Sequence, residues 1–559
     1  MSPEVPGPAL AEVPRLSTSV RVEPMADADQ WLVTVDGVPV SRASAATAEL
    51  LCAMDGTNSI VDLHRRFAPE YSDTAFADLL DRFRRAGLLR GSERPPAGRV
   101  TYRPPLTIQF ATLRAPQLFD ALHRALRPAF VSWMPWVVVV SVVLGAVALI
   151  LQTRAVVAAL TSPLPTADVL LVASVLVVAT FAHEAAHGVT LTHAGARPRR
   201  AGVMLLYLGP AFFVDVTDAW RLPSRRSRVA VALAGPAVHA LIAAAAAVSA
   251  LAAPDADVRR TLLVLSCACT TVVLVNLVPF VRFDGYIALM SALDEPSLRA
   301  RTMADAGAAV RRVLFGAPRA PRALARWWSV PFGALSVLVP TALVWFALER
   351  TVRALSGAGA IGALLVLALQ ATVVLAVGVP VVRWITAGVR RGPRRARGLA
   401  LGAVVLAAGV VALAAVPVPD TRSAGFAVID GRVALVVPID DSAAVPLPGP
   451  TSVSLTTAGI LGDARVAEGT AHPQTPETVS VPLSALAPFD IPGVEVEATS
   501  IAAIDVPADA ALPSTGRASV ELGTRSVLSQ VWAAHVVAPV STLLTALTPS
   551  PSPNQEGHP

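Results

Sequence analysis

The chain has 559 residues, of which 54% are hydrophobic and 15% charged, and its mean hydropathy is +0.58. Soluble domains carry about 25% charged residues, so the deficit argues against an ordinary soluble protein and indicates that lipid surrounds much of the chain. The formal net charge of +6 comes from arginine alone, because the sequence contains no lysine. No basic run is interleaved with aromatic residues, which argues against nucleic-acid binding.

The three cysteines, Cys52, Cys267 and Cys269, predict neither a disulfide framework nor a zinc site. Residues two apart on a helix point to nearly opposite sides, so Cys267 and Cys269 do not easily share a metal. Prolines interrupt the first residues and no apolar core segment follows them, so we expect no cleaved signal peptide and a cytoplasmic amino terminus.

Residues 17–110 are predicted to form a small soluble domain after a disordered start at 1–16. Apolar runs on both sides of Asp36-Gly37 are a strong signal for a β-hairpin. Three short helices follow, over about 45–54, from Ser59 onward and over about 73–86. With return strands expected within 98–110, this pattern predicts a winged-helix fold.

Beyond Arg127 the composition changes to apolar stretches that are long enough to span a hydrocarbon core. Seven spans are predicted, at roughly 129–152, 166–192, 229–253, 259–281, 328–349, 357–382 and 398–418. They predict a mainly α-helical, polytopic membrane bundle over 129–418.

The loops between the spans predict the orientation of the chain in the cell membrane. Arginine gathers in the second, fourth and sixth loops, within 197–228, 299–326 and 390–397. Because arginine-rich loops stay on the cytoplasmic side, all three loops agree with a cytoplasmic amino terminus. Seven spans then place the carboxy-terminal region outside.

From about Asp420 the chain turns to short valine-rich runs broken by proline, glycine and aspartate, which predict a β-rich extracytoplasmic domain over 420–547. The runs that flank Asp430-Gly431 predict another hairpin. Residues 525–547 are predicted as an amphipathic helix on the membrane surface, with an eighth span as the alternative. Residues 548–559 are predicted to be a disordered tail.

The second span contains His183-Glu184-Ala185-Ala186-His187. Histidines four apart lie on one helical face, so both can reach one cation, while Glu184 can hold a metal-bound water without binding the metal itself. Zinc lowers the pKa of such a water to about 7, and Glu184 would take its proton and pass it to the leaving amine. The alternative is a chance cluster of polar residues. A metal site is favoured because an ionisable group inside a bilayer costs about 2.5–3.5 kcal/mol unless it is paired or coordinated.

A third ligand is expected near the end of the fourth span, where Asn276-Leu277-Val278-Pro279 precedes Asp284-Gly285. Asp284 and the two histidines all lie near the cytoplasmic ends of their spans, so antiparallel packing would bring them to one depth. From the spacing alone, a solvated aspartate in a turn is an equally good interpretation of Asp284.

Together the two segments resemble the paired signature of the site-2 protease family of intramembrane zinc metalloproteases. The resemblance implies Zn²⁺ as cofactor, with Asp284 as third ligand and Asn276 helping to hold the catalytic centre by steadying the oxyanion. Gly235-Pro236-Ala237-Val238-His239 resembles the Gly-Pro helix of the family, although many members have asparagine at the position of His239. His239 is interpreted either as a hydrogen-bond donor behind the metal ligands or as a packed core histidine.

Residues 200–228 resemble the re-entrant hairpin by which such enzymes offer a strand edge to an extended substrate. The residues assigned to substrate binding on this basis are Gly202, Val203, Met204 and Leu205. A short buried hairpin is the alternative, and Asp215 and Asp218 are interpreted as solvated or turn residues.

Residues 17–91, which end in Gly87-Leu88-Leu89, resemble the PqqD-like peptide-recognition domain. That module implies binding of the leader of a ribosomally made, modified peptide by strand addition, whereas winged helices more often bind DNA or proteins. Joined to a membrane zinc protease, it resembles the peptide zinc metalloproteases of modified-peptide gene clusters, with daptide-type biosynthesis proteases as the nearest subgroup.

The resemblances imply hydrolysis of a peptide bond in a precursor peptide, with the lipid bilayer and other maturation or export proteins as further partners. Two alternatives stay open. One is regulated cleavage of a membrane-spanning regulator such as an anti-sigma factor. The other is a non-proteolytic binding or export component that keeps a zinc-binding fold.

Overall fold

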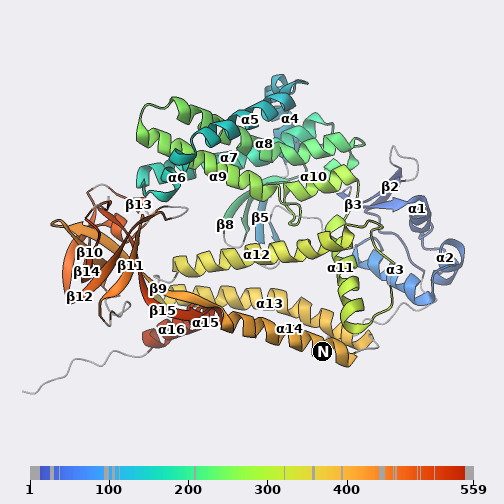
Figure 1. Ribbon diagram of the computed structural model, residues 1–559. Coiled ribbons are helices and arrows are strands. Elements are labelled where there is room, and N and C mark those ends of the chain that lie inside the picture. The colour runs from blue at the N-terminus through green and yellow to red at the C-terminus, as the bar shows by residue number, and fades with distance from the viewer. Residues whose placement is uncertain are drawn as a thin grey trace, which may run out of the picture. The chain divides into compact units, whose positions relative to one another are not determined.

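The computed structural model describes the following residues: 13–24, 30–36, 38–92, 100–103, 107–112, 114–206, 209–319, 321–355, 359–391, 395–439, 447, 449–457, 459, 463–487, 489–491, 493–508, 510 and 512–547 (Figure 1). The chain forms two compact units, Met1–Gln152 with Ala173–Ser297 and Thr153–Val172 with Leu298–Pro559. The tails predicted to be disordered lie outside the described residues, apart from 13–16. There, Arg15 and Leu16 form β-bridges to Asp55 and Leu89.

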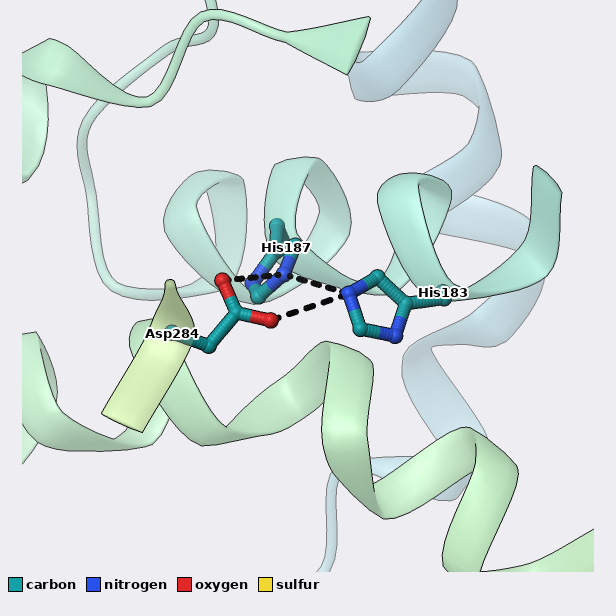
Figure 2. Close-up of side chains that lie close together, drawn as sticks. All are labelled: His183, His187 and Asp284. Carbon is teal, nitrogen blue, oxygen red and sulfur yellow. Dashed lines mark hydrogen bonds and ion pairs between the residues drawn. The ribbon is translucent and has the colours of Figure 1, made fainter. Parts of the chain in front are cut away.

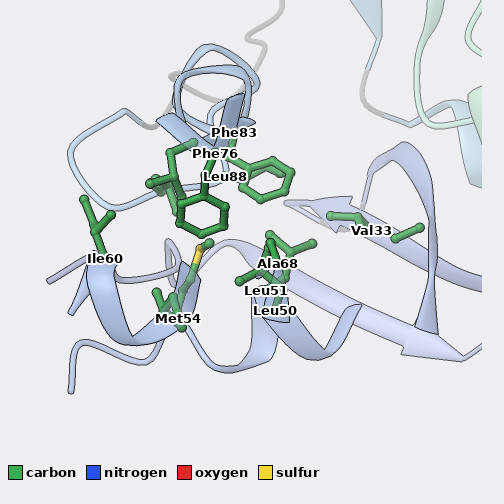
Figure 3. Packing of buried hydrophobic residues seen from close by; sticks show 13 residues of the cluster. Val33, Leu50, Leu51, Met54, Ile60, Ala68, Phe76, Phe83 and Leu88 are labelled. Atoms are coloured by element: carbon green, nitrogen blue, oxygen red, sulfur yellow. The ribbon is translucent and has the colours of Figure 1, made fainter. Parts of the chain in front are cut away.

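The first unit begins with a three-stranded sheet and three helices. Their bounds are β1 Val20–Pro24, β2 Gln30–Val35, β3 Val38–Ser44, α1 Ala45–Cys52, α2 Ile60–Phe67 and α3 Asp73–Arg85, with the strands in the order β1-β2-β3. The predicted hairpin is confirmed, and Asp36 takes the left-handed conformation that its tight turn requires, with φ of 51°. Ser44, Ser59 and Ser72 each cap a helix by accepting a backbone N–H. The helices enclose a core that includes Met54, Phe76 and Leu88 (Figure 3).

The prediction that 98–110 returns to this first sheet is wrong. The strands β4 Val100–Arg103 and β5 Thr107–Thr112 instead join β7 Ala201–Leu206 and β8 Gly209–Val214 in a separate sheet of order β4-β5-β7-β8. The paired residues of β5 and β7 lie 89 to 99 positions apart in the sequence, so no local pattern could indicate this pairing. The core of the amino-terminal domain accordingly ends at Leu89.

Six helices complete the first unit: α4 Ala115–Leu126, α5 Met134–Leu151, α7 Thr166–His193 (from Ala173 onward), α8 Arg225–Ala252, α9 Ala256–Asn276 and α10 Asp284–Leu293. Helix α8 packs against α5, α9 and α10. Two glycines allow close helix contacts: a Cβ on Gly145 would lie 2.6 Å from Cα of Ala244, and one on Gly188 would lie 2.3 Å from Phe119. Helix α8 is therefore the central helix of the first unit.

The second unit contains further helices and a barrel. The helices are α6 Thr153–Thr161, α11 Leu298–Phe315, α12 Ser329–Leu355, α13 Gly359–Arg391, α14 Arg395–Ala415, α15 Val527–Trp532 and α16 Ala538–Leu547. Across the described residues of both units, eight helices are long enough and apolar enough to cross a membrane. The chain is a polytopic membrane protein, and the seven stretches predicted from the sequence all coincide with such helices.

The carboxy-terminal β-rich region is a closed barrel of order β10-β14-β12-β11-β15-β9. Its strands are β9 Pro417–Ile429, β10 Arg432–Pro438, β11 Thr451–Thr456, β12 Arg465–Pro482, β14 Glu495–Asp505 and β15 Thr515–Ser526. The hairpin predicted at Asp430-Gly431 is confirmed, since both residues have positive φ. A short strand β13, Phe489–Asp490, pairs in parallel with β6, Leu164–Pro165, directly before α7.

The eighth apolar helix, Val527–Leu547, is the alternative that the sequence left open for this segment. Its polar residue His535 lies in a π-helical turn, Ala533–Val537, and is 7% exposed. His535 Nε2 lies 2.9 Å from Oε1 of Glu349 in α12, and Nδ1 lies 3.0 Å from Nε2 of Gln370 in α13. Three apolar helices thus satisfy one another's polar groups, which accounts for a histidine inside such a segment.

We expect His535→Leu to lower the unfolding free energy in detergent by about 1–2 kcal/mol, because polar contacts between apolar helices contribute about that much. Thermal unfolding of the purified protein measures the change. The matched control is His472→Leu, because His472 also pairs with a carboxylate, at 3.2 Å from Asp505, but its side chain is 48% exposed. An equal loss of stability in both variants would contradict this role of His535.

Candidate metal centre

Helix α7 positions three polar side chains within one turn. His183 and His187 are each 5% exposed, and their Nε2 atoms lie 3.3 Å apart. The separation of four residues places both rings on one face, so the two nitrogens point at a common position. Glu184, between them, is half-buried.

Asp284 reaches the same position from the first residue of α10 (Figure 2). Its Oδ2 lies 3.0 Å from Nε2 of His183, and its Oδ1 lies 3.4 Å from Nε2 of His187. Gly285 allows this approach, since a Cβ there would lie 2.3 Å from the carbonyl oxygen of Leu277 at the end of α9. The structure therefore brings together the three residues that the sequence assigned as ligands.

The distances in this cluster suit a tetrahedral metal. Ligand atoms about 2.0–2.1 Å from zinc lie about 3.3 Å from one another, close to the 3.0–3.4 Å observed here. His187 Nδ1 lies 2.7 Å from the carbonyl oxygen of Val231, which can only accept, so Nδ1 carries the proton and the Nε2 lone pair is available to a metal. Among the described residues, no other group of three His, Cys, Asp or Glu side chains converges in this way.

The charge of Asp284 also fits a metal ligand. Burial raises the pKa of this carboxyl, but the facing imidazoles of His183 and His187 lower it by more, to about 2. The carboxylate is therefore ionised at neutral pH, as metal binding requires.

Gly235 in α8 leaves the space that this cluster needs. A Cβ at this position would lie 2.4 Å from Nε2 of His187 and 2.5 Å from Nε2 of His183. Any side chain here would occupy the position at which the histidine nitrogens converge. In the Gly-Pro segment, the absence of a side chain at Gly235 thus makes room for the two histidine rings.

Glu184 faces a cavity with a volume of about 390 Å³ that His187 and Asp284 also line. Its Oε2 accepts the backbone N–H of Val214, the last residue of β8, at 3.1 Å. The Glu184 carboxylate is thus held beside His187 and Asp284, at the end of strand β8. Val214 was not indicated by the sequence, because its contribution is a backbone group.

Two further predicted residues are placed differently. Asn276 does not line this cavity; its side-chain amide donates to the carbonyl of Val272 on its own helix, at 3.0 Å. The structure therefore does not support a role for Asn276 in steadying an oxyanion. His239 is 1% exposed and lies beside His183, with ring centroids 5.4 Å apart. No hydrogen bond joins the two rings, and Nδ1 of His239 has no partner among the described residues. Both interpretations of His239 therefore stay predictions.

The assignment of Gly202, Val203, Met204 and Leu205 to a substrate-binding edge needs correction. They lie in β7, which pairs with β5 on one side and β8 on the other, so its backbone has no free edge. The outer strand at this end of the sheet is β8. The backbone N–H of Asp215 donates to the carbonyl oxygen of Arg200, which lies next to the start of β7. Because backbone groups alternate in direction along an antiparallel strand, those of Phe212 and Val214 point away from β7.

Asp215 and Asp218 are not simply solvated. Asp218 lies 3.0 Å from Arg199 and 3.7 Å from Arg221, and its side chain is 14% exposed. Asp215 accepts from the backbone and hydroxyl of Thr217, as an Asx turn, and its carboxylate lies 3.9 Å from Arg200. Both aspartates hold the segment between β8 and α8 in place.

Comparisons with family models, with curated proteins and with solved structures found no match to this chain.

Proposed function

We propose that this protein is a membrane-embedded zinc metalloprotease. The observation that carries the proposal is the convergence of His183, His187 and Asp284 at 3.0–3.4 Å, with Glu184 in the same cavity. Zinc bound there would supply a Lewis acid and activate a water molecule. No other part of the described chain offers a comparable arrangement.

In this proposal the protein's own residues provide positioning and proton transfer. His183, His187 and Asp284 hold the ion, and Val231 orients His187. Glu184 is the general base that takes the proton of the attacking water and then the general acid that protonates the leaving amine. The backbone N–H of Val214 holds the Glu184 carboxylate toward the cavity.

The substrate would bind as an extended strand along β8. The outward N–H and C=O groups of Phe212 offer main-chain hydrogen bonds to an added strand. This edge ends at Val214, which contacts Glu184. A peptide paired with β8 would thus be led to the catalytic carboxylate.

We further propose that the substrate is a ribosomally made precursor peptide whose leader binds the amino-terminal domain. This domain contacts the segments on both sides of the β7–β8 hairpin. Arg221, after β8, lies 3.2 Å from Glu23 in β1, and Arg199, before β7, donates to the carbonyl of Asp36. The neighbouring Ala219 and Trp220 line the cavity. A leader bound on this domain would raise the effective concentration of the cleavage site, with both on the cytoplasmic side of the cell membrane and the barrel outside.

The Asp284→Asn variant tests the metal site. We expect it to lose at least about tenfold in zinc affinity, because a neutral amide is a weaker ligand than a carboxylate, and to lose precursor cleavage with it. Zinc content of the purified protein and mature peptide from membranes are the two measurements. Asp218→Asn is the control, since Asp218 pairs only with arginines in the described structure. Stoichiometric zinc in Asp284→Asn, or none in the native protein, would contradict the proposal.

Deleting residues 1–91 tests whether the substrate is a leader-bearing precursor or a membrane-spanning regulator. We expect maturation of a leader-bearing precursor to fall by at least about 100-fold, the range that tethering contributes, while zinc content stays unchanged. Cleavage of a membrane-spanning regulator would persist in the truncated protein. Normal precursor maturation without residues 1–91 would therefore favour regulated intramembrane cleavage.

A further inference from the structure

One wall of the catalytic cavity contains a buried amide with an unused acceptor. Gln109, in β5, is 7% exposed and lines the cavity together with Glu184 and His187. Its Oε1 has no hydrogen-bond partner among the described residues, and its Nε2 has only the sulfur of Met204 at 3.9 Å, a weak acceptor. Buried polar groups in proteins are almost always paired, so an orphan that faces a cavity indicates a ligand.

A loosely held arginine lies beside this amide. Arg200 is 8% exposed and lines the same cavity. Its Nη1 lies 3.4 Å from Oγ1 of Thr101, and its Nε lies 3.9 Å from Asp215. Thr101 is the direct cross-strand partner of Gln109, so the guanidinium and the amide are neighbours.

The second buried arginine of the cavity provides a contrast. Arg228 lies 2.6 Å from Asp294 and donates to the carbonyl of Leu222 at 2.7 Å. Short contacts of this kind indicate a structural ion pair. Among the described residues the guanidinium of Arg200 makes only long contacts, so its donors are better placed to bind a substrate.

We propose that Gln109 and Arg200 form a polar specificity subsite for an uncharged substrate side chain, a carboxamide or hydroxyl, that flanks the scissile bond. Such a group donates to Oε1 of Gln109 and accepts from Arg200. A carboxylate would be repelled by Oε1 of Gln109 and by the carboxylate of Asp215, which lines the same cavity, and an aliphatic side chain would leave Gln109 and Arg200 unpaired. This inference rests on the proposed protease function and names the substrate residue that its site selects.

Binding of peptide hydroxamates tests the subsite without turnover. The probes are dipeptide hydroxamates whose side chain next to the zinc-binding group is Asn, Ser, Asp or Leu, and calorimetry on the full-length, zinc-loaded protein in detergent gives each Kd. We expect the Asn and Ser ligands to bind about tenfold or more tightly than the Leu and Asp ligands. In Gln109→Met and Arg200→Met this preference should shrink to within about twofold, while the Leu ligand keeps its affinity.

Stability distinguishes a binding role from a structural one. Gln109→Met removes an unpaired buried amide, so its Tm should stay unchanged or rise, whereas a residue that supports the fold would lower it. Gln474→Met is the matched control, because Gln474 donates to Ser500 in the barrel, and it should keep the native ligand preference.

The other possible binding results would refute either the subsite or the proposed protease function. Tightest binding of the Leu or Asp ligand, equal binding of all four, or an Asn preference that survives Gln109→Met would refute the subsite while leaving the metal centre in place. If no hydroxamate bound to the zinc-loaded protein, the proposed protease function would fail and the subsite with it.

Discussion

The Glu184→Gln variant should bind zinc as the native protein does and yet hydrolyse its precursor about 10²–10⁴-fold more slowly, the usual contribution of a general acid–base residue. Glutamine keeps the shape of the side chain and can still accept the Val214 N–H. It cannot take a proton from water at neutral pH. Mature peptide formed by membranes, quantified against zinc content, measures the effect.

Glu477→Gln is a suitable control, because Glu477 is an exposed barrel residue and the same change there should leave the rate unaltered. Persistent maturation by Glu184→Gln would count against hydrolysis by this site. It would favour the third function, a non-proteolytic binding or export component that keeps its metal.

Gly235→Ala should empty the metal site although it adds one methyl group. The new Cβ would lie 2.4 Å from Nε2 of His187 and 2.5 Å from Nε2 of His183, so the rings would have to move apart. We expect zinc affinity to fall by at least about 10–100-fold, the loss seen when groups that orient metal ligands are disturbed. Competition with a zinc chelator measures the affinity.

The matched control is Gly402→Ala in α14, where a Cβ would meet nothing within 4 Å. Alanine should stabilise that helix by up to about 1 kcal/mol through its higher helix propensity and leave zinc binding unchanged. Full zinc affinity in Gly235→Ala would mean that the histidines converge differently from the arrangement described here.

The three side chains of the candidate metal site were predictable because their signals are local. The spacing of His183 and His187 fixes their common face, and Asp284-Gly285 stands out at the end of an apolar stretch. The strand order β4-β5-β7-β8 was not predictable, since β5 pairs with β7 across 89 to 99 residues and nothing in either segment specifies the other. For the same reason the sequence does not distinguish the free edge of β8 from the enclosed strand β7, and it contains no signal that singles out Gln109.

The apolar helices, too, could be predicted from the sequence only in part. Length and hydropathy indicated seven of them, because each is a continuous apolar run. The eighth was ambiguous because His535 reads as a polar interruption. Its partners, Glu349 and Gln370, lie in helices more than 160 residues earlier, so only the packed structure explains how a histidine is accommodated there.

The barrel is joined to two apolar helices with almost no intervening chain. Helix α14 ends at Ala415 and β9 begins at Pro417, while β15 ends at Ser526 and α15 begins at Val527. Strands β9 and β15 pair with each other from these junctions onward. The barrel therefore cannot tumble on a flexible stalk, and a single nick in one of its loops would leave each of the two fragments attached to an apolar helix instead of releasing the barrel.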